Sequence, residues 1–403
     1  MDYIKKENAI KNKLLRNVTL DYIGTFVSNL NMQSSIWVLY LAYCGLNLAQ
    51  IGFVEGIYHA TSIVFEIPSG AVADLLGRKK SMVFSRICIA ISCVIMLFAR
   101  NVWFFALSFA IQALGNNLNS GSEEALVYDS MKYAGQEERY MSVCGKLNMI
   151  IEVSQGIATV IGGILAEFSY FWCYCACVMI AVLALIPIVW MVEPPYAEYN
   201  NSMSVREMIT LHFRACFQIL QSDNRILKII IYYAVVFAAE TLLFFYSQQY
   251  FFEQGYNKIQ ISLILLVVGG ASCIGAIASE HIYYRLGKST VRIASVVIAV
   301  AFMGYGFQNI FLSVIGLTAA GFCNSMLYPI QSKLLNSLIP SKQRATLISV
   351  NSMFFSIAMI LLFPLAGMLA DKWGLTIVLM GIGFVLLGFI VCWEYIIFHA
   401  SSI

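Results

Sequence analysis

The sequence GAVADLLGRKK, residues 70–80, joins two long apolar segments of the chain. Gly77 is expected to form a tight turn between two helices, because glycine adopts backbone conformations that other residues avoid. Gly70 would allow neighbouring helices to approach closely. Asp74 places a carboxylate directly before a cluster of basic residues at the end of an apolar segment. We expect this stretch to be a short polar turn at a membrane surface.

The composition of the whole chain supports this interpretation. Of 403 residues, 60% are hydrophobic and only 12% are charged, whereas soluble domains are about half apolar and a quarter charged. A bilayer core requires about 20 apolar residues for each helical span, so the chain can supply about twelve spans. This composition excludes a nucleic-acid-binding module, a secreted disulfide scaffold and a cytosolic enzyme. It predicts an all-α protein that crosses the bilayer many times.

Apolar windows between charged residues, glycines and prolines predict the positions of these spans. They run over residues 18–43, 47–74, 80–99, 102–131, 141–167, 169–191, 226–253, 258–284, 289–307, 309–335, 342–370 and 374–398. The polar segment 193–225 separates a first half, 1–192, from a second half, 226–403. Within this segment, apolar residues at helical spacing lie opposite Arg206 and Arg214, which indicates an amphipathic helix on the membrane surface. We favour a linking role for this helix over a regulatory one.

The basic residues define an orientation. If both termini are cytoplasmic, all but three of the 25 Lys and Arg residues fall on the inner side, as the positive-inside rule requires. The exceptions are Arg100, Lys258 and Lys372. A missed or invented span would invert every later loop, so the asymmetry favours an even number of spans with both termini inside.

The two halves also repeat each other. EERYMSVCGKLNMI, beginning at residue 137, resembles KQRATLISVNSMFF, beginning at residue 342, and aligns Arg139 with Arg344. GGILAEF and AGMLADK then align Glu167 with Asp371 at nearly the same offset. Parallel repeats of this kind are common in membrane transporters. We expect two pseudo-symmetric bundles of six helices.

The stretch at residues 70–80 resembles motif A of the major facilitator superfamily, although Leu75 replaces a basic residue of that motif. The resemblance implies that Asp74 meets the start of the helix near Arg344. It also implies that Arg78 pairs with an acid at the end of the fourth span, here Asp129. The predicted conformational gate consists of Gly70, Asp74, Gly77, Arg78, Lys79 and Asp129.

In this superfamily the first, fourth, seventh and tenth spans line the central cavity. The resemblance therefore implies candidate residues for substrate or proton binding, namely Asn31, Asn117, Glu123, Glu124, Glu240, Tyr246, Gln248, Asn324, Tyr328 and Gln331. Glu240 lies near the middle of its span, where an ionisable group is costly and is usually functional. Glu66 and Glu152 are weaker candidates, expected to pack between helices. We expect Asp21 to lie near the inner surface in contact with water.

These features predict a secondary active transporter of the cytoplasmic membrane that works by alternating access as a monomer. Aromatic residues crowd the span 226–253, among them Tyr232, Tyr233, Phe244, Phe245, Tyr246, Tyr250 and Phe251. They favour amphipathic, cationic ligands, and proton-coupled drug efflux by antiport is therefore the first hypothesis. The proline of the helix-5 signature of such antiporters is absent, since Ala158 and Thr159 replace the central Gly-Pro. Proton-coupled uptake of a sugar, peptide or siderophore is the alternative. A membrane-embedded enzyme is a remote third, because no metal-binding, P-loop or serine-hydrolase motif occurs. No cofactor, metal or nucleic acid is expected.

Overall fold

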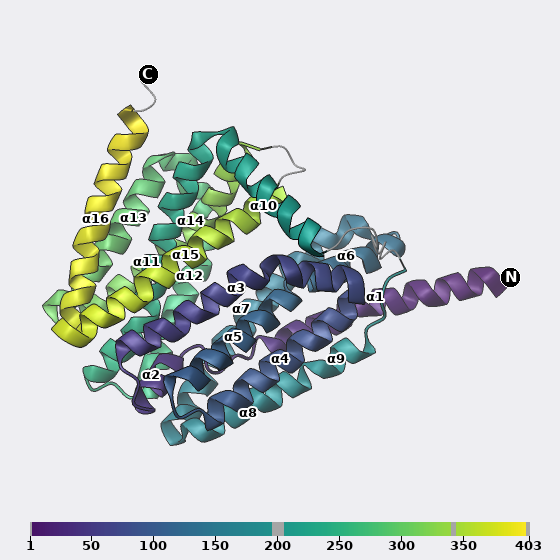
Figure 1. The fold of residues 1–403 in the computed structure, drawn as a ribbon, viewed down its shortest axis with the longest axis horizontal. Coiled ribbons are helices and arrows are strands. Elements are labelled where there is room, and N and C mark those ends of the chain that lie inside the picture. Colours follow the sequence, from purple (N-terminus) through teal and green to yellow (C-terminus); the bar gives the residue numbers. More distant parts are fainter. Residues whose placement is uncertain (1, 196–204, 340–343, 400–403) are drawn as a thin grey trace. The chain divides into compact units, whose positions relative to one another are not determined.

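The computed structural model describes residues 2–195, 205–339 and 344–399, and every regular element in these ranges is a helix. Packing divides the chain into two compact units. The first unit contains residues 1–34 and 60–212, and the second contains residues 35–59 and 213–403. Figure 1 traces the helices along the chain.

The first unit contains most of the helices before residue 212. They are α1 (Asp2–Ser28), the later part of α3 (Leu48–Leu76), α4 (Arg78–Phe98), α5 (Val102–Asn119), α6 (Ser122–Tyr133), α7 (Tyr140–Phe168), α8 (Tyr170–Leu183) and α9 (Leu185–Trp190). A 3-10 turn, η1 (Glu137–Arg139), precedes α7. Helix α4 packs against α5 and α8, and α1 packs against α6, α7 and α9. These contacts surround the pocket described below.

Two predicted spans are interrupted by non-helical backbone, whereas the span expected at 169–191 has only a one-residue turn with helical backbone angles at Ala184, between α8 and α9. The span expected at 18–43 ends as a helix at Ser28 and resumes as α2 (Trp37–Tyr43), and the span expected at 102–131 breaks between α5 and α6. At the first break, Asn29 donates a side-chain hydrogen bond to the carbonyl of Thr25, which competes with continued helix formation. At the second break, Gly121 has φ 74°, a value that a helix interior does not accommodate. The prediction of continuous helices was wrong at these two positions.

The second unit contains α2, the first part of α3 and the helices that follow the linker. These are α11 (Asn224–Glu253), α12 (Lys258–Leu286), α13 (Ser289–Gly304), the turn η2 (Tyr305–Phe307), α14 (Ile310–Asn336), α15 (Arg344–Trp373) and α16 (Leu375–His399). Helices α12 and α13 pack against α14, and α11 packs against α15. The predicted amphipathic linker is helical as α10 (Val205–Ser222). Its Cys216 and Ile219 are buried in an apolar cluster with α11 and α14.

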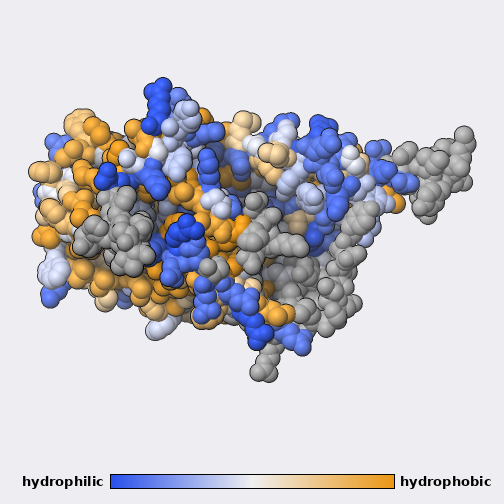
Figure 2. Space-filling model, turned by 90° about the horizontal axis from the view of Figure 1, so that it is seen from above, coloured by the Kyte–Doolittle hydropathy of each residue, from blue (hydrophilic) through white to orange (hydrophobic). Residues whose placement is uncertain are grey.

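The helices have the length and surface of membrane spans. Within the described residues, nine helices are long and apolar enough to cross a membrane. The other three predicted spans coincide with α1 and α2, with α3, and with α5 and α6. Large apolar side chains are exposed on the helix surfaces, for example Val267, Ile274 and Ile277 of α12, and Figure 2 shows extensive apolar areas of surface. Such surfaces are stable when they face lipid.

Candidate functional site

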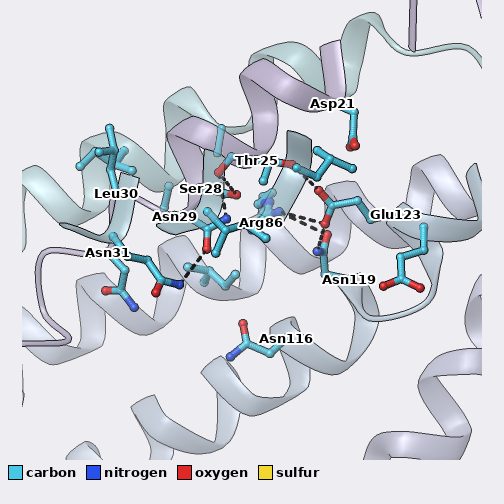
Figure 3. Close-up of a pocket in the computed structure, with 18 of the residues that line it drawn as sticks. Asp21, Thr25, Ser28, Asn29, Leu30, Asn31, Arg86, Asn116, Asn119 and Glu123 are labelled. Carbon is cyan, nitrogen blue, oxygen red and sulfur yellow. Dashed lines mark hydrogen bonds and ion pairs between the residues drawn. The ribbon is translucent and has the colours of Figure 1, made fainter. Parts of the chain in front are cut away.

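A pocket of about 420 Å³ lies within the first unit, a volume typical of small-molecule sites. Its walls come from α1 and the segment after it, and from α4, α5, α6, α7 and α8. Side-chain amides dominate its polar lining: Asn29, Asn31, Gln33, Gln112, Asn116, Asn119, Asn148 and Gln155. Figure 3 shows the part of this lining where α1 faces α5 and α6.

A hydrogen-bonded network around Glu123 crosses this pocket (Figure 3). Thr25 donates its hydroxyl to Glu123 Oε1 at 3.0 Å, and the amide nitrogen of Asn119 donates to Glu123 Oε2. Arg86 Nη2 lies 4.0 Å from Glu123 Oε2 and 3.3 Å from Asn119 Oδ1. The Arg86 residue is only 8% exposed. The network therefore holds the Glu123 carboxyl group close to a buried guanidinium group.

Asp21 lies beside this network without joining it. The residue is 1% exposed, and neither carboxyl oxygen has a hydrogen-bond partner in the part of the chain that the structure describes. Figure 3 shows its carboxyl group on the Glu123 side of α1. With Asp21 and Glu123 both ionised, the buried cluster would carry two negative charges against the single positive charge of Arg86. One further positive charge would balance the cluster.

Several amides of the pocket are available to a ligand. Among the described residues, Asn31, Gln112 and Asn148 make no side-chain hydrogen bond to the protein, yet all three line the cavity. An amide offers two N–H donors and a carbonyl acceptor. The pocket can therefore hydrogen-bond a polar solute from several directions.

The turn at residues 70–80 has a defined geometry in the first unit. Gly77 has φ 99° and joins α3 directly to α4. Arg78 forms an ion pair with Asp129 of α6 and donates to the carbonyl of Ala125 at 2.7 Å. The arginine thereby links the start of α4 to the middle of α6.

A further carboxylate, Glu193, caps the same helix start. Its two oxygens accept hydrogen bonds from the backbone N–H groups of Arg78, at 2.8 Å, and Lys79, at 2.9 Å. The Lys79 ammonium group donates to the carbonyl of Val189 at 2.7 Å. The first N–H groups of a helix have no partner within the helix, and the positive end of the dipole favours an anion there. Glu193 therefore anchors the segment after α9 to the start of α4.

Comparison with known proteins establishes the family. The model of the Major Facilitator Superfamily matches residues 22–307 and 285–401. The chain belongs to the Major Facilitator Superfamily. It is 21% identical over 350 residues to the MFS-type transporter YxaM of Bacillus subtilis, covering 85% of this chain and 86% of YxaM. It is also 27% identical over 196 residues to the inner membrane transport protein YajR of Escherichia coli, covering 47% of this chain and 39% of YajR.

Solved structures share the fold of this superfamily member. A peptide transporter POT in complex with sulfate aligns with a TM-score of 0.73 at 14% identity, over 95% of this chain and 94% of the other. The nucleoside transporter NupG aligns with a TM-score of 0.71 at 16% identity, over 96% and 99% of the two chains. The chain is thus a multi-pass membrane transporter with the MFS fold, not an enzyme.

Gly70 and Asp74 are the remaining residues of the predicted conformational gate. The expected close approach at Gly70 is absent among the described residues, since a Cβ built there would meet nothing within 4 Å. Asp74 lies in α3, but its side chain is outside the part of the structure that is described, as is that of Arg344. The predicted contact between Asp74 and the start of α15 stays a prediction.

The predicted acids separate into two groups. Glu123 and Glu124 both line the pocket, Glu123 within the network and Glu124 exposed. Glu240 is buried in α11, only 6% exposed, and does not line this pocket, and neither do Glu66 and Glu152. The roles of these three in proton coupling stay predictions.

Most of the polar candidates that are not acids form hydrogen bonds within the protein or lie outside the pocket. Asn31 lines the pocket, whereas Asn117 exchanges two hydrogen bonds with Ser62 of α3. In the second unit, Gln331 donates to Asn351 at 2.7 Å and Tyr246 donates to the carbonyl of Phe363 at 3.1 Å. Gln248 is buried, Asn324 is half-buried and Tyr328 is exposed. None of these second-unit residues lines the described pocket, and their place on a substrate path stays a prediction.

The sequence-based interpretation missed the centre of the network. Asp21 was expected to contact water but is buried, and Arg86 was counted as a loop cation although it lies eight residues into α4. At 1.5 Å per residue that is about 12 Å along the helix. A cation at such depth requires a counter-charge, and this was the signal that could have identified the site. Within the described residues, no cluster of His, Cys, Asp and Glu could hold a metal ion.

Proposed function

We propose that this MFS transporter imports a small polar organic solute together with protons, and that the solute binds in the amide-lined pocket of the first unit. The observation that carries this proposal is the set of three pocket amides, Asn31, Gln112 and Asn148, whose side chains make no hydrogen bond within the described residues. Hydroxyl, amide and heterocyclic groups pair with amides, whereas an amphipathic drug offers few such groups. Tyr140 is the one aromatic residue among those that line the pocket.

Most of the aromatic residues that favoured amphipathic ligands are part of the core of the second unit instead. Tyr246, Tyr250 and Phe251 of α11 are fully buried. Tyr250 packs against Tyr305 with ring centroids 4.6 Å apart. Since these rings contact each other and lie outside the described pocket, they lend no support to an aromatic ligand cavity.

The buried cluster provides the site for coupling to protons. With both carboxyl groups ionised, the cluster of Asp21, Glu123 and Arg86 would carry one negative charge that Arg86 does not balance. The oxygens of Asp21 are closed to solvent. A proton fits that position, whereas a hydrated metal cation requires room and several oxygen ligands. Glu124 is the other charged group among the residues that line the pocket, which also include the titratable side chains of Tyr140, Cys144 and Cys177. Asp21 therefore replaces Glu240 as our first candidate for the proton carrier.

Uptake is the direction that we propose, and the solute classes named for proteins of the same fold support it. POT is a peptide transporter and NupG a nucleoside transporter, and both names denote polar solutes. Efflux of drug-like compounds remains the competing hypothesis. We also propose that the protein lies in the cytoplasmic membrane as a monomer with both termini inside.

Ligand-dependent stabilisation of the purified protein tests the substrate class. Thermal unfolding is measured with nucleosides, dipeptides, monosaccharides and cationic amphiphiles. A ligand at 100 times its Kd stabilises the folded state by about 2.7 kcal/mol, so one polar class should raise the Tm by several degrees. Asn148→Ala and Gln112→Ala should remove that increase. The matched amide variant Gln249→Ala, on α11 outside the pocket, should retain it.

A different outcome would contradict the proposal. If cationic amphiphiles raise the Tm and the polar solutes do not, the efflux hypothesis is favoured. If a polar solute stabilises the two pocket variants as well as the wild type, then the solute binds elsewhere.

A further inference from the structure

The end of α15 carries a second copy of the motif spacing found at residues 70–77. GMLADKWG, residues 367–374, matches GAVADLLG in the positions of both glycines, of one alanine and of the aspartate. The final glycine of each copy forms the turn into the next helix, with φ 99° at Gly77 and φ 87° at Gly374. The two copies therefore share their local geometry as well as their spacing.

In the second copy the aspartate binds the start of another helix. Asp371 accepts hydrogen bonds from the backbone N–H groups of Leu48 and Ala49, each at 2.9 Å, with one oxygen for each. These groups belong to the first turn of α3, where N–H donors lack helical partners and the dipole is positive. Asp371 itself lies in the last turn of α15, where a negative charge is unfavourable for its own helix. The hydrogen bonds to the start of α3 therefore explain why an acid occurs at this position.

Backbone contacts bring the same two helices close together. A Cβ at Gly367 would overlap the backbone of Leu48, and a Cβ at Gly52 would overlap the backbone at Phe363. The Tyr246 hydroxyl group lies 3.3 Å from the carbonyl of Leu48 and 3.1 Å from that of Phe363. The start of α3 therefore packs directly on α15 and α11.

This contact involves a helix that takes part in two packing units. Residues of α3 up to His59 pack in the second unit, and residues from Ala60 onward pack in the first. The helix has 29 residues and is about 43 Å long, which exceeds the thickness of a bilayer core. Asp371 at its start and Asp74 near its end therefore lie at opposite membrane faces.

We propose that Asp371 is a releasable clamp of the transport cycle, which holds α3 on α15 at the membrane face opposite motif A. Its carboxylate is exposed, so water can replace both hydrogen bonds when the helices separate. At Gly52 and Gly367 each glycine approaches backbone atoms of the other helix, so neither position has a side chain that would resist separation of the helices. The described structure has this clamp closed, and a state open at that face requires its release.

Hydrogen exchange of the full-length protein in nanodiscs tests this inference. In Asp371→Asn, exchange of the amides at residues 48–52 should rise at least tenfold. At the same time, exchange at the start of α15, residues 345–350, should fall, because opening one face favours closure of the other. Asp74→Asn should give the reverse pattern, and the double variant should lie between the two.

Two further variants keep the test decisive. Glu253→Gln, an exposed acid at the end of α11, should leave both segments unchanged, and Asp371→Glu should restore part of the protection at residues 48–52. If Asp371→Asn loosens residues 48–52 with no change at residues 345–350, Asp371 is a structural cap only and the clamp is refuted. If neither segment changes, the contact does not hold α3 at all. The readout requires no substrate, so it is independent of the proposed solute.

Discussion

At the scale of single residues, carboxylates bound to helix starts recur in this protein. Glu193 binds the first N–H groups of α4, and Asp371 binds those of α3. In both cases the acid lies more than 100 positions from its partner in sequence, so neither contact could be predicted from local capping patterns. The buried group Asp21 shows the same limitation. Its position in the chain suggested contact with water, whereas the packing of α1 against neighbouring helices leaves it buried.

Replacement of Glu193 tests the value of such a cap. Glu193→Gln removes the charge and leaves one acceptor for two N–H groups, so the free energy of unfolding should fall by about 1 kcal/mol. The change is measured as a lower midpoint of thermal unfolding in detergent. Glu138→Gln, an exposed acid of η1, is the matched control and should leave the midpoint unchanged. An unchanged midpoint in Glu193→Gln would show that water replaces the cap without cost.

At the scale of helices, the sequence predicted the spans well because apolar length and loop charge are averaged properties. The same averaging concealed the two breaks, at residues 29–36 and at Gly121, because each lies inside an apolar window. It also placed Arg86 in a loop, since the charge count ignores how far a residue lies inside its helix. The motif turn was predictable because the spacing of its glycines is local, whereas the pocket depends on which face each helix presents.

The orientation of the helices can be tested by labelling. Single cysteines at Glu138, between α6 and α7, and at Gln254, after α11, are introduced into a variant that lacks the eleven native cysteines. With both termini inside, a membrane-impermeant maleimide added to intact cells should label position 254 and not position 138. The reverse pattern would invert the proposed topology.

At the scale of the whole molecule, the family and the fold are established by the match over nearly the entire chain. The pocket and the cluster around Asp21 support proton-driven accumulation of a polar solute. Two carboxyl groups are candidates for the proton carrier, Asp21 in the first unit and Glu240 in the second. Glutamine or asparagine at each position removes the exchangeable proton with little change in shape.

The most direct measurement is uptake of the stabilising solute into proteoliposomes with and without a pH gradient, acidic outside. With proton coupling, the solute should accumulate above the external concentration only when the gradient is present. Asp21→Asn should reduce that accumulation at least tenfold yet preserve exchange of solute in the absence of a gradient, and Glu240→Gln should accumulate like the wild type. Undiminished accumulation by Asp21→Asn would exclude Asp21 as the proton carrier, and selective loss of accumulation in Glu240→Gln would assign that role to Glu240.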